Sequence, residues 1–161
     1  MPAVQRGKFV ELNVEKFADG GTSVAHVDEV PVRVEEVIGT ELVEDAVANA
    51  RMSAEMNGVD NCTFVSGDLK DLLTPSFAGE HGRPDVLIVD PPRAGMHKNV
   101  VEQVATLAPE RFVYVSCNPQ TQACDLERLR DACRVDTVQP VDMFPHTPHV
   151  ENVVRLTRAT D

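Results

Sequence analysis

A nearly continuous apolar run, Asp85-Val86-Leu87-Ile88-Val89, limits the folds open to this chain more than any other feature. A strand that is apolar at almost every position is covered on both faces, and such strands occur in parallel sheets flanked by helices. Pro91-Pro92 follows the run and ends it, because proline cannot donate a ladder hydrogen bond. The run therefore predicts a buried parallel strand in an α/β sheet.

Strand and helix patterns alternate around this run, over the C-terminal four-fifths of the chain. Strands are predicted at 37–41, 62–65 and 112–115, followed by a closing hairpin of 135–143 and 149–156 joined at 145–148. Helices are predicted from Val43 to Asn57-Gly58, from Val100 to Leu107, and from Asn118-Pro119 through Leu126 and Leu129 to Cys133. Alternating βα units predict a doubly wound, mostly parallel sheet, which binds ligands at the carboxyl ends of its strands.

The first residues of the chain follow a different pattern. Lys8–Val14, Ser23–Val27 and Val30–Val34 alternate apolar and polar residues, with a turn at Gly20-Gly21. We therefore predict two domains, a short β segment over 1–34 and the α/β domain over 35–161. So short a β segment cannot close a barrel, and it is expected to pack on the rest of the chain or on a partner.

Composition excludes several classes of protein. The 161 residues are 42% hydrophobic and 25% charged, which is typical of a soluble globular protein. No apolar run approaches the roughly 20 residues of a membrane span, and the N-terminus lacks the apolar stretch of a secretory signal, so we predict a cytoplasmic protein without a membrane partner. The four cysteines include no Cys-x-x-Cys pair, so no metal site is predicted.

Net charge gives no support for binding nucleic acid. The formal charge of −11 repels polyphosphate at long range, so any such function has to rest on motifs. Local basic side chains could still line a site. They include Arg93, His97, Lys98 and Arg155.

Three polar motifs lie at the predicted ligand-binding edge of the sheet. They are Asp90-Pro91-Pro92-Arg93, Ser116-Cys117-Asn118-Pro119 and His146-Thr147-Pro148-His149-Val150-Glu151. Two carboxylates, a thiol and a guanidinium at one edge are the parts of a nucleophilic site with acid–base catalysis. Taken singly, each motif also has a simpler interpretation: a turn that ends a strand, a buried small cysteine, or a solvated glutamate.

Together the three motifs resemble those of the RNA uracil-C5 methyltransferases, over about 36–158 of this chain. The resemblance implies that Cys117 is the nucleophile and Glu151 the general base. It also implies that Asp90 holds the uracil edge or the methionine end of the cofactor. Arg93, Asn118 and His149 are then expected to contact the substrate, which is RNA, either rRNA or tRNA. A helix beginning at Asn118-Pro119 places its positive end beside Cys117, which favours the thiolate.

The same resemblance implies S-adenosylmethionine as cofactor and a Rossmann-like class I methyltransferase sheet. Glu41 matches the acidic residue for the ribose hydroxyls, and Asp68 the one that meets the adenine. The first strand and the Gly-rich loop that normally precede Val37 have no counterpart, because the sequence passes almost directly from Val34 to Val37. A parallel crossover needs a dozen or more residues, so the sheet is expected to be incomplete.

Alternatives follow from this gap. The chain could be active, or it could be a catalytically silent remnant that keeps a surface for nucleotides or RNA; self-association could supply a strand to the sheet. Residues 1–34 resemble the start of a TRAM domain, a small RNA-binding β-barrel. A third alternative is an amino-group methyltransferase, in which Asp-Pro-Pro is typically followed by an aromatic residue. Arg93 stands at that place here, which disfavours this alternative.

Overall fold

The computed structural model describes residues 13–17, 23–27, 30–31, 36–143 and 145–159. The chain forms two compact units, Met1–Asp68 and Leu69–Asp161. The boundary predicted between residues 34 and 35 falls where the chain is not described, and it stays a prediction. No helix in the described ranges is long and apolar enough to cross a membrane.

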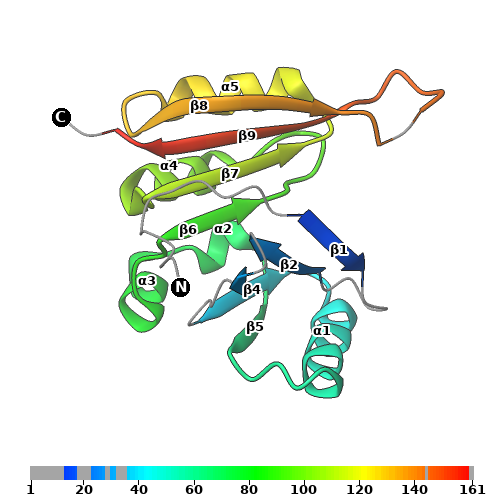
Figure 1. Cartoon of the computed structure of the whole chain (residues 1–161). Coiled ribbons are helices and arrows are strands. Elements are labelled where there is room, and N and C mark those ends of the chain that lie inside the picture. The colour runs from blue at the N-terminus through cyan, green and yellow to red at the C-terminus, as the bar shows by residue number, and fades with distance from the viewer. Residues whose placement is uncertain (1–12, 18–22, 28–29, 32–35, 144, 160–161) are drawn as a thin grey trace. The chain divides into compact units, whose positions relative to one another are not determined.

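The first unit contains two small sheets. In one, β1 (Asn13–Phe17), β2 (Ser23–Val27) and β3 (Val30–Pro31) pair antiparallel in that order. In the other, β4 (Val37–Glu41) and β5 (Cys62–Ser66) pair in parallel, connected by α1 (Glu44–Met56) (Figure 1). This strand–helix–strand unit was predicted. Residues 8–12, 32–34 and Gly20-Gly21, on which part of the predicted β segment rests, lie outside the described residues.

Two contacts connect the strands and helix of the second small sheet. A Cβ atom at Gly39 of β4 would lie 2.9 Å from the Phe64 ring on β5, so the close approach requires glycine. The Arg51 guanidinium of α1 donates to the Phe64 carbonyl oxygen at 2.6 Å. In α1 only Val47 is buried.

The second unit is a four-stranded sheet with helices. Its elements are α2 (Leu69–Leu72), α3 (Pro75–His81), β6 (Val86–Val89), α4 (Lys98–Leu107), β7 (Arg111–Ser116), α5 (Pro119–Leu129), β8 (Cys133–Val141) and β9 (Glu151–Arg158). The strand order is β6-β7-β9-β8. The pair β6–β7 is parallel, whereas β9 lies antiparallel between β7 and β8 (Figure 1). The last two strands therefore form the predicted hairpin.

One face of this sheet carries the core of the unit. Along β7, Phe112, Tyr114 and Ser116 are fully buried, and the residues between them are half-buried. Val154 and Leu156 of β9 continue the same buried face, and α4 and α5 pack against it through side chains that alternate with helical spacing. The buried apolar residues of these two helices are Val100, Val101, Val104 and Leu129.

Four expectations differ from the structure in detail. The run predicted to be a strand covered on both faces forms β6, in which Val86 is 46% exposed and Ile88 67%, because an apolar sequence shows which residues favour burial and not which elements cover each face. The helix predicted to run to Cys133 ends at Leu129, and Cys133 begins β8, because burial in a strand and burial on a helix are indistinguishable for one small apolar residue. The hairpin strands are each displaced by about two residues from the predicted ranges. The short helices α2 and α3 were not predicted, since neither is long enough to show a helical period.

Candidate active site

The pairing of β7 with β9 ends next to both Cys117 and Glu151. Ser116 of β7 and Asn152 of β9 are the last partners of this antiparallel pair. The next step of the same register joins Cys117, directly after β7, to Glu151, the first residue of β9. Both side chains are half-buried, so they are sheltered yet reachable by a substrate. Opposite residues of an antiparallel pair lie about 4.5–5.5 Å apart at Cα.

The turn after Cys117 is fixed by local hydrogen bonds. The Ser116 hydroxyl accepts from the Asn118 N–H at 3.1 Å, and the Asn118 side-chain oxygen accepts from the Gln120 N–H at 3.1 Å. Asn118 is thereby the N-cap of α5, and Pro119 occupies the first helical position, where its missing N–H costs nothing. The helix start predicted beside Cys117 is confirmed, and the positive end of α5 lies next to the sulfur in sequence.

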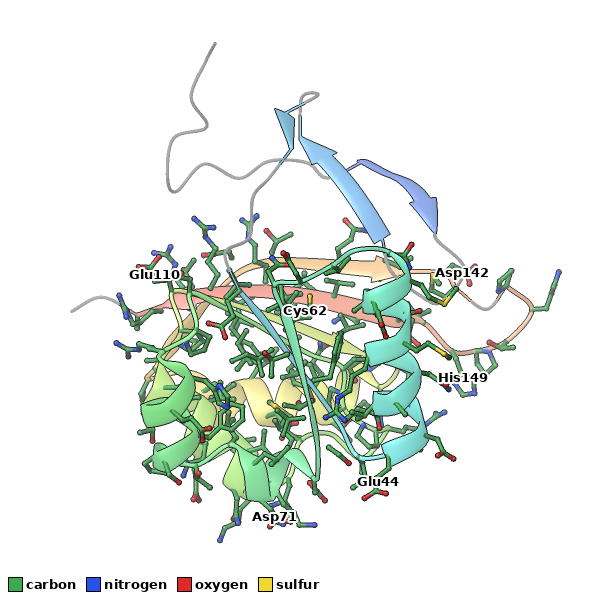
Figure 2. The ribbon with its side chains drawn as sticks, turned by 90° about the horizontal axis from the view of Figure 1, so that it is seen from below. Glu44, Cys62, Asp71, Glu110, Asp142 and His149 are labelled. Atoms are coloured by element: carbon green, nitrogen blue, oxygen red, sulfur yellow. The ribbon has the colours of Figure 1, made fainter. Side chains whose placement is uncertain are left out.

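The loop after β6 is tied to the beginning of α5. The Arg93 carbonyl oxygen accepts from the Asn118 amide at 3.2 Å and from the Thr121 hydroxyl at 3.1 Å. The Arg93 guanidinium lies 3.3 Å from Nδ1 of His149. The three motifs predicted to converge therefore do so within the second unit. Figure 2 shows His149 on the segment that joins β8 to β9.

A buried carboxylate accepts a hydrogen bond from the loop after β6. Asp125 of α5 is 3% exposed, and its Oδ2 accepts from the Met96 N–H and the Tyr114 hydroxyl, both at 2.8 Å. A Cβ atom at Gly95 would lie 2.7 Å from the same oxygen, and Gly95 has a φ of +85°, so only glycine fits there. Burial, with the hydrogen bond to Asp125, raises the pKa of Tyr114 well above its ordinary value of 10.0.

A second set of buried polar contacts joins α5 to β7 and β9. The Gln122 side-chain amide donates to the Tyr114 carbonyl oxygen at 2.9 Å and to the Asn152 carbonyl oxygen at 3.1 Å. Its oxygen accepts from the Asn152 side chain at 2.6 Å. Sequence reasoning missed Gln122 and Asp125; the available signal was a polar residue at each of two positions on the otherwise apolar stripe of a helix.

The other predicted site residues are placed as follows. Asp90 directly follows β6, at the same edge of the sheet as Cys117, and it is exposed. Glu41 and Asp68 belong to the first unit, at and after the carboxyl ends of β4 and β5. Glu41 is exposed, and one of its carboxylate oxygens accepts from the Val43 N–H at 3.0 Å.

These residues fit S-adenosylmethionine at one end only. Glu41 and Asp68 offer carboxylates suited to ribose hydroxyls and an adenine amine, with one Glu41 oxygen already bonded to the Val43 N–H. For the methionine end, the described residues provide Asp90 and no Gly-rich loop after a strand. In the described part of the chain, no cluster of three or more His, Cys, Asp or Glu side chains could hold a metal ion.

Two surface hollows of the described structure are lined by residues other than Cys117 and Glu151. One, of about 650 Å³, is lined by residues of α1, of β5 and of the loop between them, including Arg51, Asp60 and Phe64. The other, of about 290 Å³, lies between α4 and α5 beside Lys98 and Arg128. Neither is lined by Cys117 or Glu151, so the pairing of these two residues rests on strand register and not on a preformed cavity.

Solved structures resemble this chain in fold. The tRNA (uracil-54, C5)-methyltransferase of Pyrococcus abyssi, solved with S-adenosyl-L-homocysteine, is 40% identical with a TM-score of 0.65, over 76% of this chain and 29% of that one. The N-methyltransferase NodS of Bradyrhizobium japonicum, at 9% identity, has a TM-score of 0.60 over 78% of this chain and 67% of its own. The latter likeness is one of fold alone. The fold is that of class I methyltransferases.

Sequence relatives give the family. An uncharacterised RNA methyltransferase of Bacteroides thetaiotaomicron is 51% identical over 146 residues, 91% of this chain and 32% of the relative. One from Porphyromonas gingivalis is 55% identical over 127 residues, 78% of this chain and 27% of the relative. The chain thus spans about a third of the length of these relatives. Residues 20–159 match the family described as tRNA (Uracil-5-)-methyltransferase, and the chain belongs to that family.

Proposed function

We propose that this chain is the catalytic part of an S-adenosylmethionine-dependent enzyme that methylates carbon 5 of uridine in rRNA or tRNA. The observation that supports the proposal is the register of β7 and β9 in a member of this family: Ser116 pairs with Asn152, and the same register continued by one residue would set Cys117 across from Glu151. A thiol and a carboxylate across one strand pair are the nucleophile and the base that this reaction needs. Because its substrate would be cellular RNA, we infer a cytoplasmic location.

Cys117 would begin the reaction. Carbon 5 of uracil is a poor nucleophile, so the Cys117 thiolate first adds to carbon 6, and the electrons of the 5,6 double bond move to the carbonyl at carbon 4 as an enolate. The proton of the thiol has already passed to solvent or to a nearby base. Cys117 directly precedes Asn118, the N-cap of α5.

Glu151 would complete the reaction. When bound, S-adenosylmethionine supplies the methyl group that carbon 5 takes up. The Glu151 carboxylate then removes the proton from carbon 5, the double bond re-forms, and the bond between sulfur and carbon 6 breaks to release Cys117 as a thiolate. Glu151 is half-buried at the start of β9.

The remaining site residues would bind the substrate and the cofactor. Arg93 and His149 lie 3.3 Å apart at the loop edge and are suited to a phosphate or a uracil carbonyl, and Asn118 lies beside them. Asp90 would hold the uracil edge or the methionine end of the cofactor. Glu41 would bind its ribose and Asp68 its adenine.

A catalytically silent remnant is the second candidate, and strand pairing favours it. Among the described strands, β4 pairs only with β5, and β6 pairs in the sheet only with β7, so neither parallel strand has its second neighbour. Such a protein would keep a surface for nucleotides or RNA without methyl transfer. Self-association would complete the sheet by donating a strand, and a TRAM-like segment over 1–34 would add contacts to RNA.

Trapping with 5-fluorouracil RNA separates the two candidates. Fluorine at carbon 5 cannot leave as a proton, so an active chain with S-adenosylmethionine should form a covalent adduct with the RNA, visible as a mass increase at Cys117. Cys117→Ser should abolish the adduct, whereas Cys124→Ser should not, because Cys124 is an exposed thiol on α5. No adduct, under conditions in which a full-length relative is trapped, would exclude the active enzyme.

A further inference from the structure

Gln122 is a buried amide with every polar atom of its side chain engaged. It lies in the first turn of α5, two residues after Gln120, whose N–H donates to the side chain of the N-cap residue Asn118. Its side chain is buried, with 1% of the residue exposed. Its nitrogen donates to carbonyl oxygens of two strands, Tyr114 on β7 and Asn152 on β9. Its oxygen accepts from the Asn152 side chain, which is itself buried.

The two carbonyl groups belong to the strands whose ends carry Cys117 and Glu151. Tyr114 is three residues before Cys117, and Asn152 directly follows Glu151. A slip of one residue between β7 and β9 would turn each side chain to the opposite face of the sheet. It would also remove the acceptors of Gln122 in an interior where an unpaired amide is costly. Gln122 therefore opposes any displacement of one strand end relative to the other.

We propose that Gln122 is a positioning residue, which holds the ends of β7 and β9 in the register that faces Cys117 to Glu151. The inference rests on the proposed function, because it gives Gln122 the task of aligning the nucleophile with the base. Gln122 itself lies on the helix-covered face and touches neither reacting group. Its effect passes through the backbone of the two strands.

A disulfide across the strand pair measures this alignment without RNA or cofactor. Opposite residues of an antiparallel pair are about 4.5–5.5 Å apart at Cα, within the range of about 4.4–6.8 Å that a disulfide spans. Glu151→Cys thus provides a second thiol opposite Cys117. Equilibrating this variant in glutathione buffers, and quantifying the linked peptides by mass spectrometry, gives the reduction potential of the disulfide and the effective concentration of the two thiols.

Gln122→Met is the informative second substitution, since it keeps length and helix propensity while removing the amide. We expect it to lower the effective concentration of the two thiols at least fivefold, equivalent to about 20 mV of reduction potential. The matched control is Gln120→Met, an exposed glutamine of the same helix, which should leave the value within twofold. Asn152→Thr replaces the amide that donates to Gln122 with a shorter hydroxyl and keeps the backbone carbonyl. It should shift the potential in the same direction by a smaller amount, which covers the case that Gln122→Met does not fold.

The outcomes separate this inference from the proposed function. Equal potentials in the Gln122→Met, Asn152→Thr and Gln120→Met backgrounds would overturn the positioning role while leaving the facing of residues 117 and 151 intact. If no disulfide forms even with Gln122 in place, the facing itself is wrong and the inference falls with it. If Gln122→Met shifts the reduction potential of the disulfide as expected, but the native chain forms no adduct with fluorouracil RNA, the proposed activity is refuted and the positioning role stands.

Discussion

The two compact units differ in how much apolar surface they bury. In Leu69–Asp161, twelve buried side chains form one core between the sheet, α4 and α5. Among the described residues of Met1–Asp68, Val47 is the only buried hydrophobic side chain, while Met56 is 79% exposed and Leu42 64%. A unit with a packed core holds the polar residues at its edge in one arrangement. We therefore expect Cys117 and Glu151 to be held more firmly than Glu41 and Asp68.

The contrast also separates the two halves of the proposed reaction. The candidates for nucleophile and base belong to the unit with the core, and two of the three candidates for cofactor binding belong to the unit whose described residues bury a single hydrophobic side chain. Unit Met1–Asp68 exposes apolar side chains along α1, including Met52 and Met56, and a unit of that kind depends on contacts beyond its own core for stability. Weak cofactor binding is thus expected to accompany a well-formed nucleophile.

Removing a core side chain should give the largest effect. Leu129→Ala empties a fully buried position of α5 and should lower the free energy of unfolding by about 2–5 kcal/mol, from lost apolar burial and the cavity left behind. Met56→Ala in α1 should change it by less than about 0.5 kcal/mol, since that side chain is exposed. Urea unfolding followed by circular dichroism measures both. Similar losses in the two variants would contradict the contrast between the units.

Two glycines with positive φ make a finer comparison. Gly58, after α1, has a φ of +65° with open space around its Cα, so Gly58→Ala should cost only about 1–2 kcal/mol of backbone strain. Gly95→Ala carries the same strain and adds a contact of 2.7 Å with Asp125, so its cost should be about 1–2 kcal/mol larger. The measurement is again urea unfolding. Equal losses of unfolding free energy in the two variants would mean that the loop after β6 shifts to accommodate the added methyl group and that Asp125 does not hold this loop in place.

Tyr114 gives the smallest but most selective test. It is the only tyrosine of the chain, so absorbance near 295 nm reports its ionisation alone. Burial and the bond to Asp125 raise its pKa, so the folded protein should show no phenolate as the pH passes 10. A raised pKa in the folded state contributes stability that is complete below pH 10, where an unfolded tyrosine is also protonated, and that is lost as the pH rises beyond it. A phenolate signal near pH 10 from a chain that remains folded would show that the site is open to water.

Several features could be predicted from the sequence because they are local. The apolar run before Pro91-Pro92 predicts a strand that ends there, and β6 ends at Val89. Asn118-Pro119 predicts a helix start, since an N-cap acceptor and a fixed φ act on neighbouring residues. The three motifs could be expected at one edge because parallel strands of a doubly wound sheet end on the same side.

Other features depend on residues far apart in the chain. Cys133 is apolar and small, which suits a helix end as well as a strand, and only pairing with Arg158 places it in β8. The contacts of Gln122 and Asp125 become visible only when α5 lies over β7 and β9, because their partners are 8 to 30 residues away in sequence.

The sequence by itself determined the α/β alternation, the helix start beside Cys117 and the resemblance of the three motifs to one family, since each follows from the chemistry of adjacent residues. Only the tertiary structure decided that β9 lies antiparallel beside β7 with Asn152 across from Ser116, a register that, continued by one residue, would face position 151 to position 117. Strand register depends on which faces are buried together and on which buried amides find acceptors, and no short stretch of sequence contains both partners of such a contact.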